Sequence, residues 1–498
     1  MLRRIQIKWI AIGFLLSGAL LSSCKKYIEL KPHDATYDQV FWSSGENAEK
    51  ALAGAYGLFR GALRYNSPDA DGPAFFVTGD LPTDEFWVDA NYFWFLQKVI
   101  PVGRNTYSYT PYFEASVKDW TRFYAAVNQC HLVVENVEKI PEEKFDGGVS
   151  LKNQIAGEAR FLRAYTYFYL TRIWGDPVLT KESLKDPLSV QPIARSSEED
   201  VLNYCIEDLK QAAALLDFNT GTAISKIRAD KGAAWALLAH VYAWKHDYKE
   251  AAKYCDSVIN SGQYQLEDVS NYENIWAGQS QESIFELNML YNADNNEATD
   301  YFFGRFLHDP LIKNKDAYTA WLVNTDLTGY LFPDPAADKR YDKIIGLQQT
   351  GDPVLIKYAN VKYYDPTNRP DAYVLNNNLV LLRLADIYLL KAEAASKNGD
   401  DGTAQQALNV VKERAGLDPS VNTGDDLFNE ILEERFRELY GEGCLAYDLI
   451  RMGKLEYWLP DSFTPDRIAK KGYYWPLDMR KLLPQDPLLT QNEWWKNH

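Results

Sequence analysis

The chain has 498 residues, of which 46% are hydrophobic, 24% charged and 14% aromatic. This composition excludes an intrinsically disordered protein, which contains few apolar and aromatic residues. The contents of 29 Gly and 22 Pro exclude a collagen-like or low-complexity chain. A formal net charge of −16 argues against a nucleic-acid partner, because nucleic-acid recognition requires a basic surface.

The first 24 residues have the layout of an export signal. Arg3 and Arg4 precede an apolar run over 9–21, and Leu-Ser-Ser and then Cys24 follow. A helix of this run would be about 20 Å long, shorter than the ~30 Å hydrocarbon core of a bilayer. The Leu-Ser-Ser-Cys sequence resembles the bacterial lipoprotein signal, whose cysteine is acylated with palmitate-type chains. We expect residues 1–23 to be removed and Cys24 to be the lipid anchor; a signal anchor or another cleavage site is the alternative.

The body of the protein is predicted to be all-α and built from tetratricopeptide-like helix pairs. The clearest pair covers 231–262, where Trp-x2-Leu-small-x2-Tyr is followed by an alanine nine residues later. A second pair covers 384–416, on either side of a Gly-Asp-Asp-Gly turn. The first helix of a third pair covers 156–174, and its partner at 201–216 is separated from it by an insertion that contains proline.

Further helices and three long insertions complete this reading. The additional helical patterns cover 47–63, 114–139 and 425–440. Strand-like runs are few and short. The irregular insertions cover 66–113, 264–378 and 452–498. Because loops of this length in a compact protein are usually functional, we expect specificity to lie in the insertions.

The charged residues of the predicted helices are interpreted as structural. Their spacing beside Ala and Leu is typical of solvated helix faces or of ion pairs between helices. These residues are Arg160, Arg163, Glu393, Arg435, Arg437 and Glu438, together with Arg383 and Asp386, which are expected to share one helix face. The four cysteines after the anchor, Cys130, Cys205, Cys255 and Cys444, are expected to be small buried thiols.

The sequence contains none of the enzyme motifs that can be recognised from sequence alone. It has no G-x-S-x-G, no P-loop, no G-x-G-x-x-G and no H-E-x-x-H. Its six histidines show no metal-ligand spacing, and His240 is interpreted as a packed or hydrogen-bonded side chain. We therefore expect no catalytic residue, no cofactor and no metal. A glycosidase carboxylate pair is defined only in space, and the sequence leaves it open.

Five motifs, in order along the chain, carry a family resemblance. They are Cys24-Lys-Lys-Tyr-Ile-Glu-Leu-Lys-Pro, Trp120-x2-Phe-Tyr with Asn128 and Asn136, Glu158-Ala-Arg-Phe-Leu-Arg-Ala with Trp174-Gly-Asp-Pro, Leu382-Arg-Leu-Ala-Asp-Ile-Tyr-Leu, and Glu433-Glu-Arg-Phe-Arg-Glu-Leu with Asp448-Leu-Ile-Arg, Tyr474-Trp-Pro and Gln491-Asn. Together they resemble the SusD/RagB family of outer-membrane lipoproteins. The stretch 443–447 departs from the family pattern, which places an aromatic residue soon after Glu-Gly, and we interpret it as a packing substitution.

The resemblance implies a fold and a function. It implies a tetratricopeptide-like α/α superhelix in which an N-terminal part, 24–230, packs with a C-terminal part, 231–498, as one globular unit. It also implies a non-enzymatic lipoprotein, anchored to the outer membrane and exposed at the cell surface, that binds an oligosaccharide or polysaccharide nutrient. The ligand would pass to a SusC-like TonB-dependent transporter. A surface glycoside hydrolase and a peptide-binding uptake lipoprotein are the alternatives.

The aromatic insertion at 80–95 is the first candidate for the ligand site. If it is helical, Asp84, Trp87, Asn91 and Trp94 share one face. Two indoles with an amide and a carboxylate suit the flat C–H faces and hydroxyl rim of a sugar. Alternatively, Trp87 and Trp94 belong to the core. A second candidate set, from the 264–378 insertion, consists of Tyr301, Phe303, Arg305 and Trp321.

Overall fold

The computed structural model describes most of the chain between residues 40 and 496. The described residues are 40–64, 74–88, 119–184, 191–290, 300–304, 306–307, 310–313, 321–347, 351–363, 365, 367–368, 372–478 and 481–496. Within these residues, no helix combines the length and the apolar character needed to cross a membrane. The predicted lipid anchor, Cys24, lies outside the described residues.

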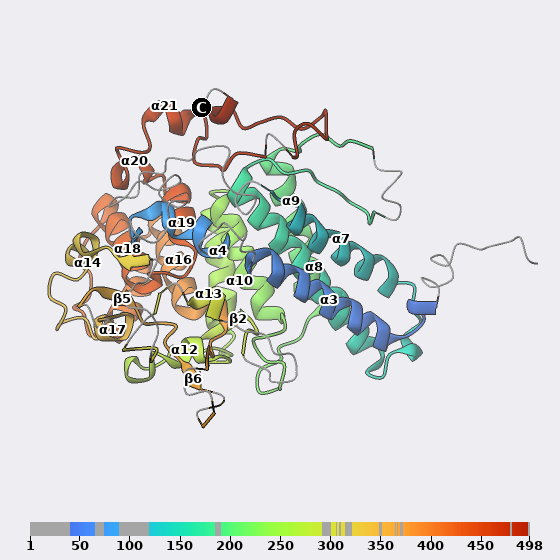
Figure 1. The fold of residues 1–498 in the computed structure, drawn as a ribbon, viewed down its shortest axis with the longest axis horizontal. Coiled ribbons are helices and arrows are strands. Elements are labelled where there is room, and N and C mark those ends of the chain that lie inside the picture. Colours follow the sequence, from blue (N-terminus) through green and yellow to red (C-terminus); the bar gives the residue numbers. More distant parts are fainter. Residues whose placement is uncertain are drawn as a thin grey trace, which may run out of the picture.

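Four long helices form one side of the molecule, where Figure 1 shows them running side by side. They are α3 (Gly45–Arg64), α7 (Thr121–Val137), α8 (Gly148–Trp174) and α9 (Glu198–Leu215). From Ile155 to Trp174 almost every residue of α8 is buried, because apolar and aromatic side chains occupy all of its faces there. Helix α8 is therefore the centre of this side, with α3, α7 and α9 packed around it.

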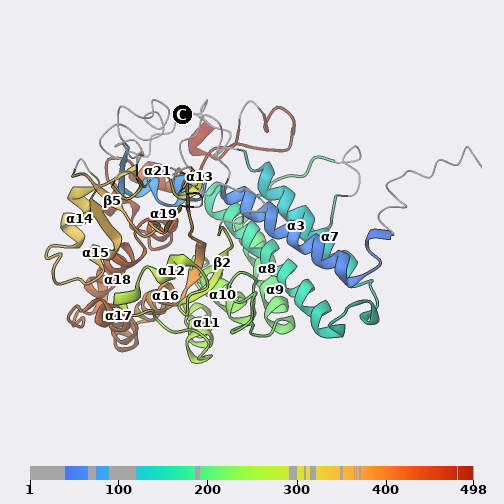
Figure 2. The ribbon, with the colours of Figure 1, turned by 60° about the horizontal axis from the view of Figure 1, so that its bottom comes forward.

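The predicted helix pairs are confirmed on the other side. The pairs are α10 (Lys231–Trp244) with α11 (Tyr248–Asn260), and α16 (Leu384–Lys397) with α17 (Asp401–Ala415). Asp230, Asp247 and Asp400 cap α10, α11 and α17, each accepting a backbone N–H with its side chain. Helix α11 packs on α16, and α18 (Gly424–Leu439) packs on α16 and α17. The pairs thus stack into one tetratricopeptide-like helical layer (Figure 2).

Short helices and strands connect the long helices, and most of them lie in the insertions, which are therefore less irregular than the sequence predicted. The helical ones are α4 (Ala74–Gly79), η2 (Leu81–Thr83), η3 (Glu142–Lys144), η5 (Val269–Asn271), α12 (Asn274–Ala277), α13 (Asp300–Phe303), α14 (Thr325–Leu331), α15 (Tyr341–Ile344), α19 (Leu445–Arg451), α20 (Leu455–Trp458), α21 (Pro465–Ala469) and η6 (Trp494–Lys496). The strands are β1 (Phe86–Val88), β2 (Ser283–Leu287), β3 (Trp321–Val323), β4 (Ile345–Leu347), β5 (Pro353–Leu355), β6 (Val361–Tyr363), β7 (Tyr373–Leu375) and β8 (Leu379–Arg383).

The strands of the described residues form antiparallel two-stranded ribbons. The pairs are β1–β3, β2–β8, β4–β5 and β6–β7. All of these strands except β1 lie in or directly after the 264–378 insertion, and β1 lies in the 66–113 insertion. The ribbons therefore tie the insertions to each other and to the helical layer, because β8 leads directly into α16.

The cysteines and His240 lie where the sequence predicted. Cys130, Cys205 and Cys255 are buried free thiols, and Cys444 is partly buried and free. His240 Nε2 lies 2.8 Å from an Asp386 carboxylate oxygen, which confirms a hydrogen-bonded side chain.

Candidate functional site

The β1–β3 ribbon places the backbone of Trp87, from the first predicted set of ligand-binding residues, next to that of Trp321, from the second. Trp87 of β1 pairs with Leu322 of β3, and Val88 pairs with Trp321. The two strands are 233 residues apart in sequence, since residue 88 is opposite residue 321. The stretches 89–118 and 314–320, which adjoin the two strands, lie outside the described residues. The ribbon is therefore where the candidate loops of both insertions are attached to the folded body.

The predicted helical face over 84–94 is wrong in its described part. Asp84 follows the short helix η2 with a φ of 64°, and the chain then extends into β1. The physical reason is the backbone pairing of β1 with β3, which overrides the helical spacing of the side chains. Asn91 and Trp94 lie outside the described residues.

Two residues of the second set are buried, which contradicts their predicted role as ligand-stacking rings. Trp321 and Phe303 have no exposed surface, so their rings have no face for a ligand. Trp321 packs edge-on against Phe306, with ring centroids 5.4 Å apart, and Phe303 stacks on Tyr358 at 4.6 Å. Tyr301 lies in α13 by its backbone, and Arg305 lies outside the described residues. The two buried rings support the ribbon from below.

The ring cluster below the ribbon draws on distant parts of the chain. Phe76 of α4 contacts Phe306 at 5.0 Å and Tyr358 at 5.8 Å between ring centroids. Phe86 of β1 contacts Trp321 at 5.7 Å and Tyr440 at 5.5 Å. Aromatic pairs of this kind stabilise beyond their buried area by roughly 0.5–1.5 kcal/mol each. The base of the candidate site is therefore a rigid aromatic core.

A turn after α18 holds the ribbon through two buried carboxyl groups. Glu85 accepts the Gly441 N–H at 2.8 Å, and its backbone oxygen accepts a short hydrogen bond from the Tyr440 hydroxyl. Asp80 accepts the Gly443 N–H at 2.8 Å with both carboxylate oxygens. Gly443 has a φ of 73°, and a Cβ atom there would lie 2.2 Å from the Phe75 ring. A glycine is thus required at Gly443 for the turn to close on α4.

The same turn explains the departure from the family pattern at 443–447. Tyr447 is buried, and its hydroxyl donates to Thr78 Oγ1 of α4 at 2.9 Å. The guanidinium of Arg172 lies 4.4 Å from the centroid of the Tyr447 ring. The departure is therefore accommodated by packing, as predicted.

Burial of these carboxyl groups predicts a pH dependence of stability. Burial raises the pKa of Glu85 from 4.5 to about 8, and burial and the neighbouring Glu85 charge raise the pKa of Asp80. Because the folded state then binds the proton more tightly than the unfolded state, the free energy of unfolding falls as pH rises from about 5 to 8. Below this window the contribution is fully present.

We expect Glu85→Gln to remove this dependence. Relative to the wild type, the variant gains up to roughly 1.4 kcal/mol of stability per pH unit between about pH 5 and 8, because its amide does not ionise. Urea unfolding at several pH values measures the difference, and Glu142→Gln, at an exposed position, is the matched control. Parallel pH curves for Glu85→Gln and the wild type would contradict a buried titrating carboxyl.

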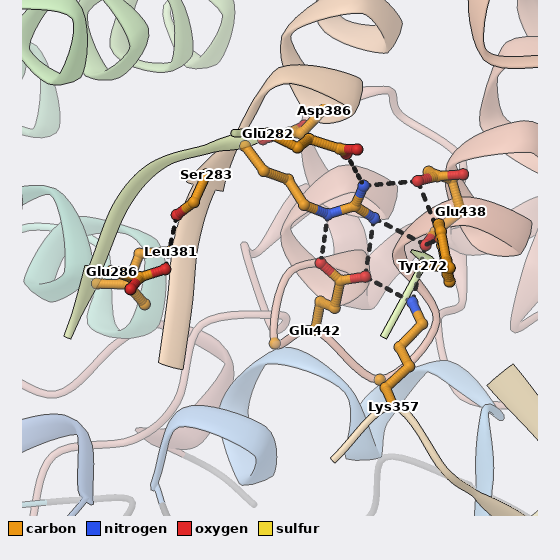
Figure 3. Close-up of polar contacts among 12 residues, drawn as sticks. Tyr272, Glu282, Ser283, Glu286, Lys357, Leu381, Asp386, Glu438 and Glu442 are labelled. Atoms are coloured by element: carbon orange, nitrogen blue, oxygen red, sulfur yellow. Dashed lines mark hydrogen bonds and ion pairs between the residues drawn. The ribbon is translucent and has the colours of Figure 1, made fainter. Parts of the chain in front are cut away.

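A buried ion-pair network lies beside the turn and is centred on Arg383 (Figure 3). Its guanidinium donates to Glu282 at 2.8 Å, to Glu438 at 2.5 Å and to Glu442 at 2.7 and 2.8 Å. Lys357 Nζ donates to Glu442 at 2.5 Å and to the backbone oxygen of Glu438 at 2.8 Å. The guanidinium therefore joins β8, the segment before β2, α18 and the turn after it.

Two further arginines complete the compensation of charge in this network. Arg340 donates to Glu438 at 2.7 Å, and Arg414 donates to Glu282 at 2.8 Å and also bonds Glu438. Burial alone would raise the pKa of Glu438, but the charges of the surrounding arginines outweigh it and hold the pKa well below its usual value. Burial, together with the charge of Arg383, lowers the pKa of Lys357. These groups are hydrogen-bonded to one another and are closed to solvent.

The sequence interpretation of the charged residues is thus half right. Ion pairs between helices are confirmed, for example Arg163 with Asp208 at 2.7 Å and Arg451 with Glu393 at 2.6 Å. The alternative prediction, a solvent-exposed helix face, is wrong for four of these residues, which are buried: Arg163, Glu393, Arg435 and Glu438. Arg383 ends β8 instead of sharing a helix face with Asp386, which pairs with Arg435 at 2.7 Å.

A cavity of about 690 Å³ lies where α9, α10, α19 and the C-terminal segment meet. At its centre Glu198 accepts from Trp244 Nε1 at 2.7 Å, from the Tyr474 hydroxyl at 2.9 Å and from Lys471 Nζ at 3.2 Å. Three protein donors therefore already occupy this carboxylate. We interpret the cavity as the place where the helical repeat contacts the C-terminal segment. The periodicity of the sequence does not predict this contact.

The described carboxyl groups next to the ribbon differ in their exposure to solvent. Asp80 and Glu85 are buried and hydrogen-bonded to protein groups, so they have no access to a substrate, whereas Asp84 is partly exposed. No group of three or more His, Cys, Asp or Glu within the described residues is placed to hold a metal ion. What the described part of the site offers is a ribbon on a helical-repeat body, in which one strand from each of two insertions pairs with the other.

Comparison with known proteins defines the class of this helical-repeat protein. The model of the SusD family matches residues 217–495, and a second family model, described as starch-binding associating with outer membrane, matches residues 76–243. The first match alone spans more than half of the chain. The chain belongs to the SusD family.

Individual relatives agree with this assignment. The SusD-like protein P38 of Formosa agariphila is 28% identical, over 98% of this chain and 99% of its own length. The starch-binding protein SusD of Bacteroides thetaiotaomicron is 23% identical, with 89% of each chain covered. A crystal structure of a SusD homolog from the same organism superposes with a TM-score of 0.75 at 24% identity, covering 91% of this chain and 98% of that one. The solved structure supports the helical repeat fold.

Proposed function

We propose that this protein is a lipid-anchored outer-membrane protein that binds an oligosaccharide or polysaccharide nutrient and passes it to a SusC-like TonB-dependent transporter. Membership of a family described by starch binding at the outer membrane supports this function. The observation that carries it is the β1–β3 ribbon, because it attaches both aromatic insertions to one rigid base. Cys24 provides the anchor, and no catalytic residue, cofactor or metal is part of the proposal.

The ligand site lies, in this proposal, on the loops attached to the ribbon. Trp87 and Trp94 supply stacking surfaces for the C–H faces of the sugar, and Asp84 and Asn91 bond its hydroxyl groups. Tyr301 and Arg305 face the same ligand from the second insertion. A neutral ligand suits an acidic protein that offers no excess of positive charge.

A glycan array tests the proposal directly. We expect the chain from residue 25 on, which keeps every described residue, to bind at least one polysaccharide without releasing reducing sugar. Turnover of a bound glycan would instead support a surface glycoside hydrolase, and exclusive binding of peptides would support a peptide-uptake lipoprotein.

Tryptophan variants locate the site. We expect Trp94→Ala and Trp87→Ala each to weaken glycan binding roughly 10-fold, because loss of one stacking surface removes on the order of 1.4 kcal/mol. Isothermal titration measures the affinity, and thermal unfolding serves as the control for folding. If both variants unfold at a much lower temperature than the wild type, the two indoles are core residues and the stacking proposal is wrong.

A further inference from the structure

Three aromatic side chains from distant parts of the sequence form an exposed cluster beside the ribbon. Tyr330 of α14 is 55% exposed, Tyr457 of α20 is 67% exposed, and Trp458 is partly exposed. The Tyr330 and Trp458 rings are 6.0 Å apart at 81°, and the Tyr457 and Trp458 rings are 6.3 Å apart at 74°. We name these three residues the aromatic patch. Figure 1 shows α14, α18 and α20 at one end of the molecule, away from α3 and α7.

The patch is held in place by the residues beneath it. Trp458 stacks on the buried Phe436 of α18, with ring centroids 4.6 Å apart and planes at 13°. The Tyr330 hydroxyl donates to Glu433 at 2.6 Å. One face of the Trp458 indole is thus covered by Phe436. The phenol rings of Tyr330 and Tyr457 lie at steep angles to the indole plane and are exposed to solvent. Such a fixed, preorganised arrangement costs little conformational entropy on binding.

The chemistry around the rings suits a sugar. Large exposed aromatic rings are individually common, but a cluster of three suggests a contact surface. The patch is bordered by one negatively and one positively charged residue. Glu433 accepts a hydrogen bond from Tyr330, and Lys454 Nζ lies 5.8 Å from the centroid of the Tyr457 ring. Stacking rings bordered by a carboxylate and an ammonium group match the apolar faces and hydroxyl edges of an uncharged saccharide.

The patch is joined rigidly to the ribbon. Asn324, which caps α14, donates its side-chain amide to the Asp84 backbone oxygen at 2.7 Å and its own N–H to the Glu85 backbone oxygen at 3.0 Å. Tyr330 follows Asn324 by six residues, which is about 9 Å along a helix. An extended chain of sugar residues bound at the ribbon therefore has a second aromatic surface within reach.

We propose that Tyr330, Tyr457 and Trp458 form an auxiliary saccharide-binding surface, which contacts a further segment of the same polysaccharide that the ribbon loops bind. This inference rests on the proposed glycan-binding function. Two contacts on one polymer raise its affinity, because the second contact forms at a high effective concentration. A short oligosaccharide, bound by the loops alone, gains nothing from the patch.

The test combines ligand length with two sets of variants. The chain from residue 25 on is titrated with starch, laminarin, xylan, inulin and mannan, and then with the tetrasaccharide of whichever polymer binds. We expect Tyr330→Ala with Tyr457→Ala to weaken polymer binding about 10-fold and to leave tetrasaccharide binding and the melting temperature unchanged. Trp94→Ala should weaken both. Tyr330→Phe, which keeps the ring, should bind the polymer nearly as well as the wild type.

The control and the contrary outcomes are distinct. Leu347→Ala with Val421→Ala removes two exposed apolar side chains elsewhere, 62% and 83% exposed, and should change nothing. Polymer binding by the Tyr330/Tyr457 variant equal to that of the wild type would overturn the auxiliary surface while leaving the proposed function intact. If the variant binds the polymer and the tetrasaccharide equally less tightly than the wild type does, the patch is part of the main site. This result would also overturn the inference of a separate binding surface. Failure of the wild type to bind any of the five polymers would contradict the proposed function, and the inference with it.

Discussion

Replacing Arg383 by methionine is expected to lower the free energy of unfolding by about 3–5 kcal/mol. Methionine cannot donate to Glu282, Glu438 and Glu442, whose carboxylates surround the guanidinium in the interior. Breaking a buried ion pair by removing one partner leaves uncompensated charge away from water, and this accounts for the size of the effect. Since Arg383 also joins β8 to α18, the loss should destabilise the body as a whole.

Chemical denaturation followed by circular dichroism measures this loss. Lys50→Met is the matched control, because Lys50 pairs with Glu46 at 2.6 Å on the surface, where the side chains are 62% and 75% exposed. Such an exposed pair contributes at most about 1 kcal/mol, so this variant should unfold nearly like the wild type. If Arg383→Met is destabilised no more than Lys50→Met, the network does not hold the fold together.

Replacing Cys24 by alanine is expected to release the protein from the membrane. In the proposed lipoprotein, this cysteine carries all of the acyl chains, and several chains are needed for durable attachment. Within the part of the chain that the structure describes, no helix is long and apolar enough to span a bilayer. Cell fractionation should find the variant in the soluble periplasmic fraction, and labelled palmitate should no longer be incorporated.

A control separates loss of the anchor from loss of export. Ser23→Ala keeps a small residue before the cysteine, so acylation and membrane retention should persist. Retention of Cys24→Ala in the membrane, or palmitate in that variant, would show that the attachment lies elsewhere. An unprocessed, cytoplasmic Cys24→Ala protein would likewise contradict its assignment to the periplasm.

Local sequence patterns predicted the helices well. Repeats at 231–262 and 384–416 fold as the pairs α10–α11 and α16–α17, because amphipathic periodicity and capping aspartates act within a few residues. The family motifs could also be recognised, because most of their residues lie close together in helices. What the motifs did not reveal was the state of their charges: Arg383 and Glu438 look like surface residues in sequence, yet they are buried together.

The candidate site was predicted only in outline. The aromatic content of 86–95 led to the first candidate insertion, but the helical spacing within it was misleading, because the partner strand β3 lies more than 200 residues away. Trp321 was a candidate because it lies in the 264–378 insertion, although Phe86 and Phe306 pack against its ring. Nothing in the local sequence indicates which distant side chains will cover a given ring.

The sequence by itself determined the helical repeats, the family and the expected export signal, because each depends on residues close together in the chain. Only the tertiary structure decided the position of the ribbon, the burial of the Arg383 network and the meeting of Tyr330 with Trp458. The physical reason is that burial and pairing depend on contacts between segments up to 369 residues apart, such as Tyr447 with Thr78. Such contacts leave no periodicity in the sequence, and the specificity of the site depends on them.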